Sequence, residues 1–320
     1  MNDQNMVRNG ASLSIVVPCF NEQEVLAETN RRLTELLGAL RQKGLVSADS
    51  HIVYVDDGST DGTWNLVQRL AGADGRIRGV KLARNRGHQA ALLAGLFTAA
   101  GDAIVSIDAD LQDDLNAIEK MLIEFGKGAE VVYGVRGSRT VDSRFKRNSA
   151  QFFYRAMRWM GVDLVHDHAD FRLLGRRAIL ALREFGEVNL FLRGIVPLIG
   201  YRSVTVTYDR AERFAGQSKY PLRKMLSFAW EGITSFSVVP LRLITLFGVL
   251  VSLFSFAMIA YIIYGTLVLK AVVPGWASSV VPIYFLGGIQ LLSTGILGEY
   301  VAKIYMESKR RPRFVIEQTI

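Results

Sequence analysis

The chain has 320 residues, half of them apolar, one cysteine and a formal net charge of +8. A single cysteine excludes an internal disulfide and suits a reducing compartment. The positive charge favours anionic partners such as lipid headgroups or phosphorylated substrates. We expect no nucleic-acid partner, because the sequence has neither zinc-ligand spacing nor a basic recognition helix. Residues 1–10 are polar and are predicted to form a disordered N-terminal tail.

Apolar, β-branched runs alternate with helical patterns between residues 11 and 220. Strands are predicted at Leu13–Pro18, Ile52–Asp56, Ile77–Leu82, Ala103–Ile107, Glu130–Val135 and Ser203–Tyr208. Helices are predicted at Glu22–Gln42, Gly62–Leu70, His88–Ala100 and Leu115–Phe125. This alternation predicts an α/β domain with a mostly parallel sheet flanked by helices. The phosphate-binding glycine motifs of dinucleotide and P-loop proteins are missing from the sequence, which argues against both classes.

Acidic residues close two of the predicted strands. Asp56 and Asp57 end one strand, and Asp108-Ala109-Asp110 follows another. Ligands of open α/β sheets bind in the crevice at the carboxyl ends of the strands. Carboxylates crowded there repel one another unless a cation or hydrogen-bond donors compensate them. A divalent cation that holds a diphosphate is the simplest compensation, since Mg²⁺ shares oxygen ligands with substrate phosphates.

Other polar motifs follow the strands in chain order. The segments are Pro18 with Asn21-Glu22, Asp56–Thr63, Arg84–His88 and Asp108–Asp113. In this order they closely resemble family 2 glycosyltransferases, whose fold is the Rossmann-like GT-A fold. The resemblance runs from about Ser12 to Tyr220, and over nearly the whole chain once the C-terminal apolar segments are included. It is closest to the polyprenyl-phosphate branch, which contains bactoprenol glucosyltransferase and, more distantly, dolichol-phosphate mannose synthase.

The resemblance implies a donor site for a nucleotide-sugar. Its residues would be Pro18, Asn21, Glu22, Asp56, Asp57, Arg84, Asn85, Asp108, Ala109, Gln112 and Arg139. It also implies that Asp108 and Asp110 bind Mg²⁺ or Mn²⁺, with Asp110 as the direct ligand and a catalytic residue. Local roles stay open, because Asn21, Asp61 and Asp114 also suit helix caps, and His88 suits a cap or the core.

Two later motifs extend the resemblance. His166–Leu173 contains an Asp-x-x-Asp-Phe-Arg-Leu segment, whose last aspartate, Asp170, would be the catalytic carboxylate. A phosphate monoester is already largely deprotonated at neutral pH, since its second pKa is ~6, so an orienting role for Asp170 is the alternative to a general base. Arg213–Tyr220 matches an Arg-x-x-Gly-x-Ser-Lys-Tyr segment. The predicted acceptor phosphate ligands are Arg136, Arg213, Ser218 and Lys219.

Ile244–Val268 and Val280–Gly298 carry no charge and are long enough to cross a bilayer as helices, and the predicted spans are about 244–268 and 280–302. Lysine and arginine concentrate outside this pair, so both termini and the catalytic domain are expected in the cytoplasm of a bacterial inner-membrane protein. Basic and aromatic residues mix in 144–160 and 221–236, as in interfacial helices. The predicted domains are 11–220 catalytic, 221–242 interfacial helix and linker, 243–304 transmembrane hairpin and 305–320 cytoplasmic tail.

The resemblance implies inverting sugar transfer from a nucleotide-sugar, with UDP-glucose the first choice, to undecaprenyl phosphate in the lipid bilayer. The product would serve later glycosylation of cell-envelope polysaccharide, such as lipopolysaccharide. A downstream flippase is expected as a partner. A homo-oligomer, a tetramer by resemblance, is expected. One alternative is a processive polysaccharide synthase, but Arg155 stands where that family's Gln-x-x-Arg-Trp motif has glutamine. The other is a non-enzymatic membrane scaffold that has kept the fold.

Overall fold

A computed structural model describes residues 10–137, 168–187, 192–209, 234, 237–267 and 275–320. The chain divides into two compact units. The described residues of the first unit are 10–137, 168–187, 192–209 and 311–320, and those of the second are 234, 237–267 and 275–310. The predicted interfacial helices at 144–160 and 221–236 lie outside the described residues, apart from Thr234.

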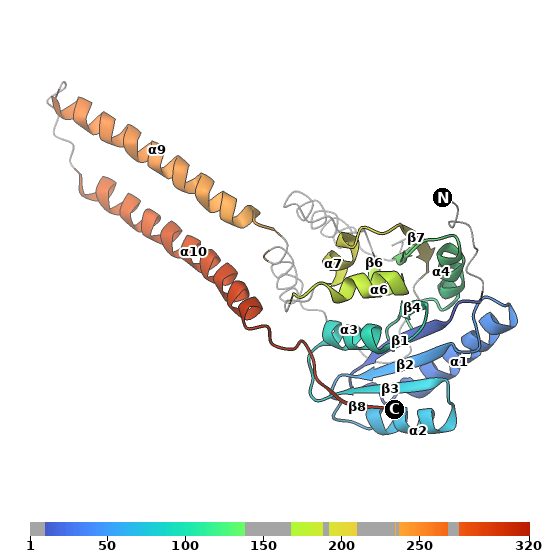
Figure 1. Ribbon diagram of the computed structural model, residues 1–320. Coiled ribbons are helices and arrows are strands. Elements are labelled where there is room, and N and C mark those ends of the chain that lie inside the picture. The colour runs from blue at the N-terminus through green and yellow to red at the C-terminus, as the bar shows by residue number, and fades with distance from the viewer. Residues whose placement is uncertain (1–9, 138–167, 188–191, 210–233, 235–236, 268–274) are drawn as a thin grey trace. The chain divides into compact units, whose positions relative to one another are not determined.

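The first unit is built on one eight-stranded sheet with strand order β7-β5-β6-β4-β1-β2-β3-β8 (Figure 1). The neighbours β1–β2, β1–β4, β2–β3 and β5–β7 are parallel, whereas β6 and β8 run antiparallel to their neighbours. The strands are β1 Leu13–Cys19, β2 His51–Asp56, β3 Ile77–Leu82, β4 Ala103–Ser106, β5 Val131–Arg136, β6 His168–Gly175, β7 Ser203–Tyr208 and β8 Ile316–Thr319.

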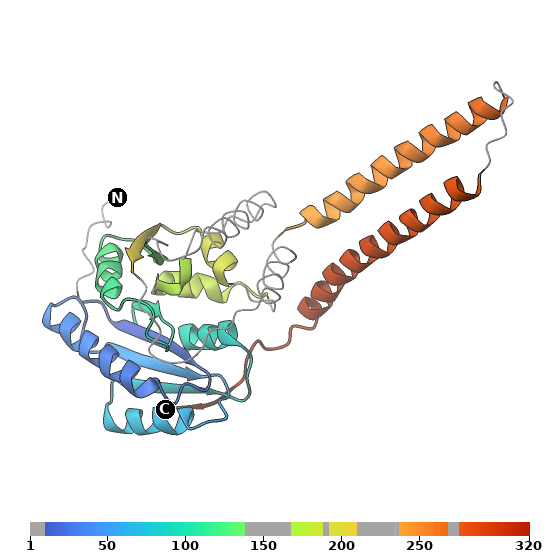
Figure 2. The same cartoon turned by 180° about the vertical axis from the view of Figure 1, so that it is seen from behind.

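Helices cover both faces of the sheet (Figure 1, Figure 2). The helices of this unit are α1 Leu26–Gln42, α2 Thr63–Ala73, α3 His88–Thr98, α4 Asn116–Gly126, α6 Arg176–Arg183 and α7 Leu192–Leu198. Alternate β1 residues Leu13, Ile15 and Val17 share a buried cluster with apolar residues of α1, α2 and α4. Val16 faces α3 on the other side, where Gly95 permits close approach because a Cβ there would overlap Val16 and Val55. This packing fixes the start of α3 at the carboxyl edge of the sheet.

The α/β class and the mostly parallel sheet predicted from the sequence are confirmed. The helix predicted from Glu22 begins instead at Leu26, because residues 20–25 form turns that start with Asn21 at φ 55°. Two strands were not predicted. β6 is inserted antiparallel between β4 and β5. β8, which lies in the predicted C-terminal tail, pairs with β3 at the edge of the sheet.

The second unit contains two long apolar helices, α9 Val239–Leu267 and α10 Trp276–Ser308. By length and composition, Val239–Met258 and Phe285–Ser308 could each cross a membrane. Their apolar side chains are exposed in this unit. Two hydrogen bonds tie the end of α10 to the residues before α9, since Tyr300 donates to the Ser237 carbonyl and Lys303 Nζ donates to Thr234 Oγ1.

Candidate active site

Asp56 ends β2 opposite Cys19 of β1 and is fully buried. Its Oδ2 accepts a hydrogen bond from the Ser59 backbone N–H at 3.3 Å, but its Oδ1 has no partner among the described residues. Burial raises the pKa of Asp56, although the contacts with Ser59 oppose that rise. A buried acceptor without a partner is costly, so a ligand N–H directed at Oδ1 would relieve the cost.

Asp57 organises the loop that follows β3. Its two carboxylate oxygens accept hydrogen bonds from the backbone N–H groups of Arg86 at 2.8 Å and Gly87 at 2.9 Å. Gly58 adopts φ +70°, and a Cβ there would lie 2.6 Å from the Asn85 backbone nitrogen. The close approach of these two loops therefore requires glycine at position 58. Arg84 and Asn85 are both exposed on the loop that Asp57 and Gly58 hold.

Asn21 fixes the loop after β2. Its Oδ1 accepts a hydrogen bond from the Thr60 backbone N–H at 2.9 Å, and its own N–H donates to Ser59 Oγ. Asn21 does not cap α1, whose first turn has no side-chain cap. Asp61 precedes the N-cap residue Gly62, and its Oδ1 accepts hydrogen bonds from the N–H and hydroxyl of Thr63, the first residue of α2. Pro18 is buried at the end of β1, and Glu22 is partly buried beside these turns.

The loop after β4 carries Asp108 and Asp110 on a strained backbone. Leu111 adopts the left-handed conformation with φ 58°, which is uncommon for a bulky residue. The Ala109 carbonyl accepts a hydrogen bond from Thr29 of α1 at 2.8 Å. Asp110 Oδ1 accepts from the Gln112 N–H at 3.2 Å. The conformation is thus held from both sides, and strain of this kind often marks a ligand site.

The end of the same loop serves the fold. Asp114 accepts a hydrogen bond from the N–H of Asn116, the first residue of α4, at 3.0 Å, although the N-cap position itself is Leu115. Asp113 is buried and accepts a hydrogen bond from the Tyr208 hydroxyl at 2.6 Å. Because Tyr208 ends β7, this contact ties the acidic loop to the far strand of the sheet.

The antiparallel strand β6 brings Asp170 to Asp108. Ser106, the last residue of β4, pairs in register with Arg172 of β6. Asp108 lies two residues beyond Ser106, and Asp170 lies two residues before Arg172, so antiparallel pairing sets the two carboxylates at one end of the sheet. Ser106 Oγ also donates to the Asp170 carbonyl.

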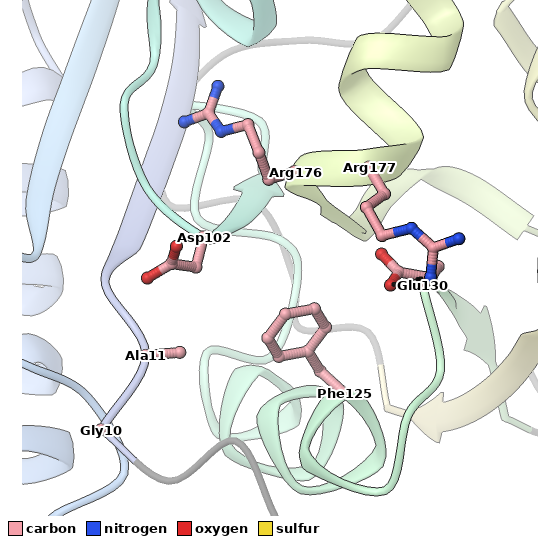
Figure 3. A pocket seen from close by; sticks show the side chains of 7 residues that line it. All are labelled: Gly10, Ala11, Asp102, Phe125, Glu130, Arg176 and Arg177. Atoms are coloured by element: carbon pink, nitrogen blue, oxygen red, sulfur yellow. Dashed lines mark ion pairs between the residues drawn. The ribbon is translucent and has the colours of Figure 1, made fainter. Parts of the chain in front are cut away.

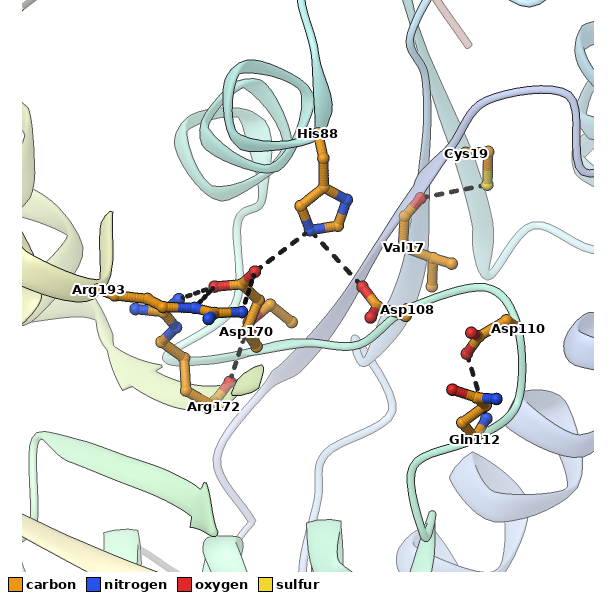
Figure 4. Close-up of polar contacts among 10 residues, drawn as sticks. Val17, Cys19, His88, Asp108, Asp110, Gln112, Asp170, Arg172 and Arg193 are labelled. Atoms are coloured by element: carbon orange, nitrogen blue, oxygen red, sulfur yellow. Dashed lines mark hydrogen bonds and ion pairs between the residues drawn. The ribbon is translucent and has the colours of Figure 1, made fainter. Parts of the chain in front are cut away.

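His88, the first residue of α3, lies between these carboxylates (Figure 4). Its Nε2 is 3.6 Å from Asp108 Oδ1 and 3.6 Å from Asp170 Oδ2. Withdrawal from water raises the pKa of Asp108 to about 6; His88 opposes this rise, and the charges of Asp113, Asp170 and Asp110 add to it. The sequence left His88 between a cap and a core residue, and the structure instead assigns it to the acidic cluster.

Two arginines neutralise Asp170 (Figure 4). Arg172 Nη2 lies 2.6 Å from Asp170 Oδ1, and Arg193 Nη2 lies 3.3 Å from Oδ2. Burial alone would raise the pKa of Asp170, but the charges of Arg193 and Arg172 outweigh it and hold that pKa well below its usual range. Asp170 is therefore a weak proton acceptor, and this arrangement favours the orienting role over the general base.

Four of the predicted phosphate-binding residues lie outside the described residues. They are Arg139, Arg213, Ser218 and Lys219. Arg136 ends β5 in register with Tyr208 of β7, and the Gly137 N–H donates to the Tyr208 carbonyl at 2.8 Å. Gly137 and Asp209, each the last described residue before a gap, therefore follow neighbouring parallel strands.

A cavity of about 390 Å³ lies at the opposite edge of the sheet, where the parallel strands begin (Figure 3). Asp102, Glu130 and Arg176 contribute to its lining, and none of the predicted site residues does. Arg176 is engaged by the carbonyls of Ala99 and Gly101. The predicted site residues therefore lie away from this cavity.

The carboxylates suit a hard divalent cation. No three carboxylate, imidazole or thiol groups among the described residues are arranged as a complete metal cage. Asp108 and Asp110 nevertheless offer oxygen donors. Withdrawal from water is the main reason that the pKa of Asp108 is raised, and the charges of Asp113, Asp170 and Asp110 add to it. A site with few protein carboxylates fits Mg²⁺ or Mn²⁺, which complete their coordination with water and substrate phosphate oxygens.

Comparison with known proteins matches the chain to a glycosyltransferase family and to individual glycosyltransferases. The model of Glycosyl transferase family 2 matches residues 14–182. The chain is 51% identical to the uncharacterized glycosyltransferase YkoT of Bacillus subtilis, over 95% of this chain and 91% of that protein. It is 39% identical to the bactoprenol glucosyl transferase of Shigella phage SfV, over 95% and 98%. A crystal structure of glucosyl-3-phosphoglycerate synthase from Mycobacterium tuberculosis, with Mn²⁺, UDP-glucose and phosphoglyceric acid, aligns over 73% of this chain and 81% of that one, with 20% identity and a TM-score of 0.46.

Proposed function

Because the chain belongs to glycosyl transferase family 2, we propose that it transfers a sugar from a nucleotide-sugar to a polyprenyl phosphate. The observation that carries the proposal is the meeting of Asp108 and Asp170 beside His88, with two arginines on Asp170. Negative groups for a metal-bound diphosphate and positive groups for an anion thus lie in one site. Similarity to a bactoprenol glucosyl transferase over 95% of the chain supports the acceptor.

The proposed reaction is a single displacement. An oxygen of the lipid phosphate forms a bond to the anomeric carbon of the sugar, and the bond from that carbon to the nucleoside diphosphate breaks. The attack comes from the face opposite the leaving group, so the configuration inverts. Asp170, held charged by Arg172 and Arg193, orients the acceptor or a sugar hydroxyl, since a largely deprotonated phosphate needs little help from a base.

The donor is proposed to bind in the loops after β1, β2, β3 and β4. The unpartnered Asp56 Oδ1 would accept an N–H of the nucleotide base. Phe20, 45% exposed in the neighbouring loop, is an aromatic surface on which that base could stack. Pro18, Asn21, Glu22, Asp57, Arg84, Asn85, Ala109 and Gln112 shape or line the same loops, and UDP-glucose is the proposed donor. Asp108 and Asp110 would hold Mg²⁺ or Mn²⁺, which offsets the charge of the departing diphosphate.

We place the acceptor at the cytoplasmic face of a bacterial inner membrane. Two helices long and apolar enough to cross a bilayer, α9 and α10, support membrane attachment. The proposed acceptor ligands are Arg136, which ends β5, and Arg213, Ser218 and Lys219, which come after β7, the parallel neighbour of β5. Arg139 is proposed to bind the donor. The tetramer, the downstream flippase and a role in lipopolysaccharide modification stay predictions.

The test is a product assay with the purified full-length protein. Undecaprenyl phosphate is incubated with a panel of nucleotide-sugars in the presence of Mg²⁺, Mn²⁺ or EDTA, and the lipid fraction is analysed by mass spectrometry. We expect one hexose on the lipid phosphate, with no product in EDTA. A polymer would support the processive synthase instead. No lipid-linked sugar from any donor with either metal would refute the proposal.

A further inference from the structure

Two guanidinium groups contact one carboxylate in the active site, and they differ in exposure. The Arg172 side chain is 1% exposed and lies 2.6 Å from Asp170, whereas the Arg193 side chain is 34% exposed and lies 3.3 Å away. Arg172 comes from the sheet itself, two residues after Asp170 on β6. Arg193 comes from α7, the helix that begins at Leu192. The short contact of buried Arg172 suits permanent neutralisation of Asp170, whereas the longer contact of the more exposed Arg193 suits binding of a ligand.

Both backbone polar groups of Leu192 are held by the active site. Its N–H donates to Gln89 Oε1 at 2.9 Å, and its carbonyl accepts from Arg172 Nη1 at 3.3 Å. At the start of α3, His88 contacts both carboxylates, and the next residue, Gln89, holds the first residue of α7. The position of Arg193 is therefore fixed by the same elements that place Asp108 and Asp170.

We propose that Arg193 binds a phosphate group of a substrate, and that Asp170 holds its guanidinium ready until that phosphate arrives. This inference rests on the proposed function. Arg172 contacts Asp170 Oδ1 on the buried side, so a phosphate oxygen that binds the more exposed Arg193 would leave Asp170 with a neutralising partner. Guanidinium groups match phosphate oxygens with paired N–H donors, which an ammonium group does not.

The phosphate has two sources, the lipid monoester and the nucleoside diphosphate, and the experiment separates them. Full-length Arg193→Gln and Arg193→Lys are compared with wild type after their melting temperatures are checked. One arm measures binding of a short-chain polyprenyl phosphate against the uncharged polyprenol. The other measures binding of UDP with Mn²⁺ against uridine. Neither arm requires turnover, so failure of the proposed sugar transfer and failure of this inference are told apart.

Arg193→Gln should weaken binding of one phosphorylated ligand by about tenfold or more, as expected for loss of a charge-assisted hydrogen bond. Binding of the uncharged analogue should stay unchanged. Arg193→Lys keeps the charge, should retain part of the affinity, and serves alone if the glutamine variant does not fold. Weaker polyprenyl phosphate binding identifies the acceptor as the source, and weaker UDP binding identifies the donor.

The matched control is Arg177→Gln. Arg177 is also an exposed arginine near a carboxylate, 3.7 Å from Glu130, but it lies at the opposite edge of the sheet. It should leave both affinities unchanged. If Arg193→Gln and Arg193→Lys bind both phosphorylated ligands as wild type does, Arg193 serves only to hold Asp170 and the inference is wrong.

Discussion

The backbone N–H of Gly87 donates a hydrogen bond to Asp57 Oδ2 at 2.9 Å. Together with the Arg86 N–H on Oδ1, this contact makes Asp57 the anchor of the loop that precedes His88. Asp56, one residue earlier, has instead a buried oxygen without a partner among the described residues. The two adjacent aspartates therefore have different tasks, one for the fold of the site and one for a ligand.

Asp57→Ala should lower both stability and turnover. Loss of two hydrogen bonds to a carboxylate should cost about 1–3 kcal/mol and release the loop that carries His88.

Asp56→Asn should weaken UDP binding without lowering the melting temperature, because burial raises the pKa of Asp56 and a neutral side chain removes the cost of burying the charge. Thermal melting and calorimetric UDP titration measure the two effects. Equal losses of stability in both variants would contradict this division.

Replacement of Asp170 should reduce turnover less than replacement of Asp110. Arg193 and Arg172 outweigh the effect of burial and keep the pKa of Asp170 well below its usual range, so its carboxylate stays charged throughout the neutral range. The deficit of Asp170→Asn should narrow above pH 7, where the acceptor phosphate, with a second pKa of ~6, completes its own deprotonation. Turnover of Asp170→Asn and Asp110→Asn from pH 6 to 9 is the measurement. A steep base-type dependence on pH in the Asp170 variant would restore the general-base role.

The motifs predicted which loops meet, because the carboxyl ends of parallel strands share one edge. They did not predict how Asp170 joins them, since that depends on β6 running antiparallel in register with β4. Arg172 was visible in the motif but carried no assigned role, and its burial against Asp170 depends on tertiary packing. Arg193 stands in an apolar stretch without a catalytic motif, so only the position of α7 reveals it.

Local patterns also missed β8. Ile316-Glu317-Gln318-Thr319 has one apolar residue in four, and all four residues are exposed. Its strand conformation comes from pairing with β3, which is distant in sequence. In contrast, the apolar patterns of β1, β2 and β4 were sufficient to predict these strands, because both of their faces are buried.

His51 should make the protein less stable in mild acid. Burial lowers the pKa of His51, whose ring contacts Ser14 Oγ at 2.9 Å and the Asp49 carbonyl at 2.9 Å. The unfolded chain binds the proton more tightly, so this contribution to stability is lost as pH falls through the unfolded pKa of ~6.5. His51→Gln should flatten the fall in melting temperature between pH 7.5 and 5.5. An unchanged slope would show that groups other than His51 cause the fall in melting temperature.

The C-terminal strand should stabilise the catalytic unit. Gly79 of β3 exchanges two backbone hydrogen bonds of 2.9 Å with Ile320, and a Cβ at Gly79 would lie 2.8 Å from Ile320 Cγ1. Ending the chain after Arg313 should therefore lower the melting temperature and make β3 an open edge. Glu317→Gln is the control, because its ion pair with Lys81 is exposed and should contribute little. Gly79→Ala should cost stability in both backgrounds, because its Cβ would also lie 2.8 Å from Val67 Cγ1, and it should cost more in the full chain, where Ile320 is present. Equal costs in the two backgrounds would mean that β8 does not pack on β3 in solution.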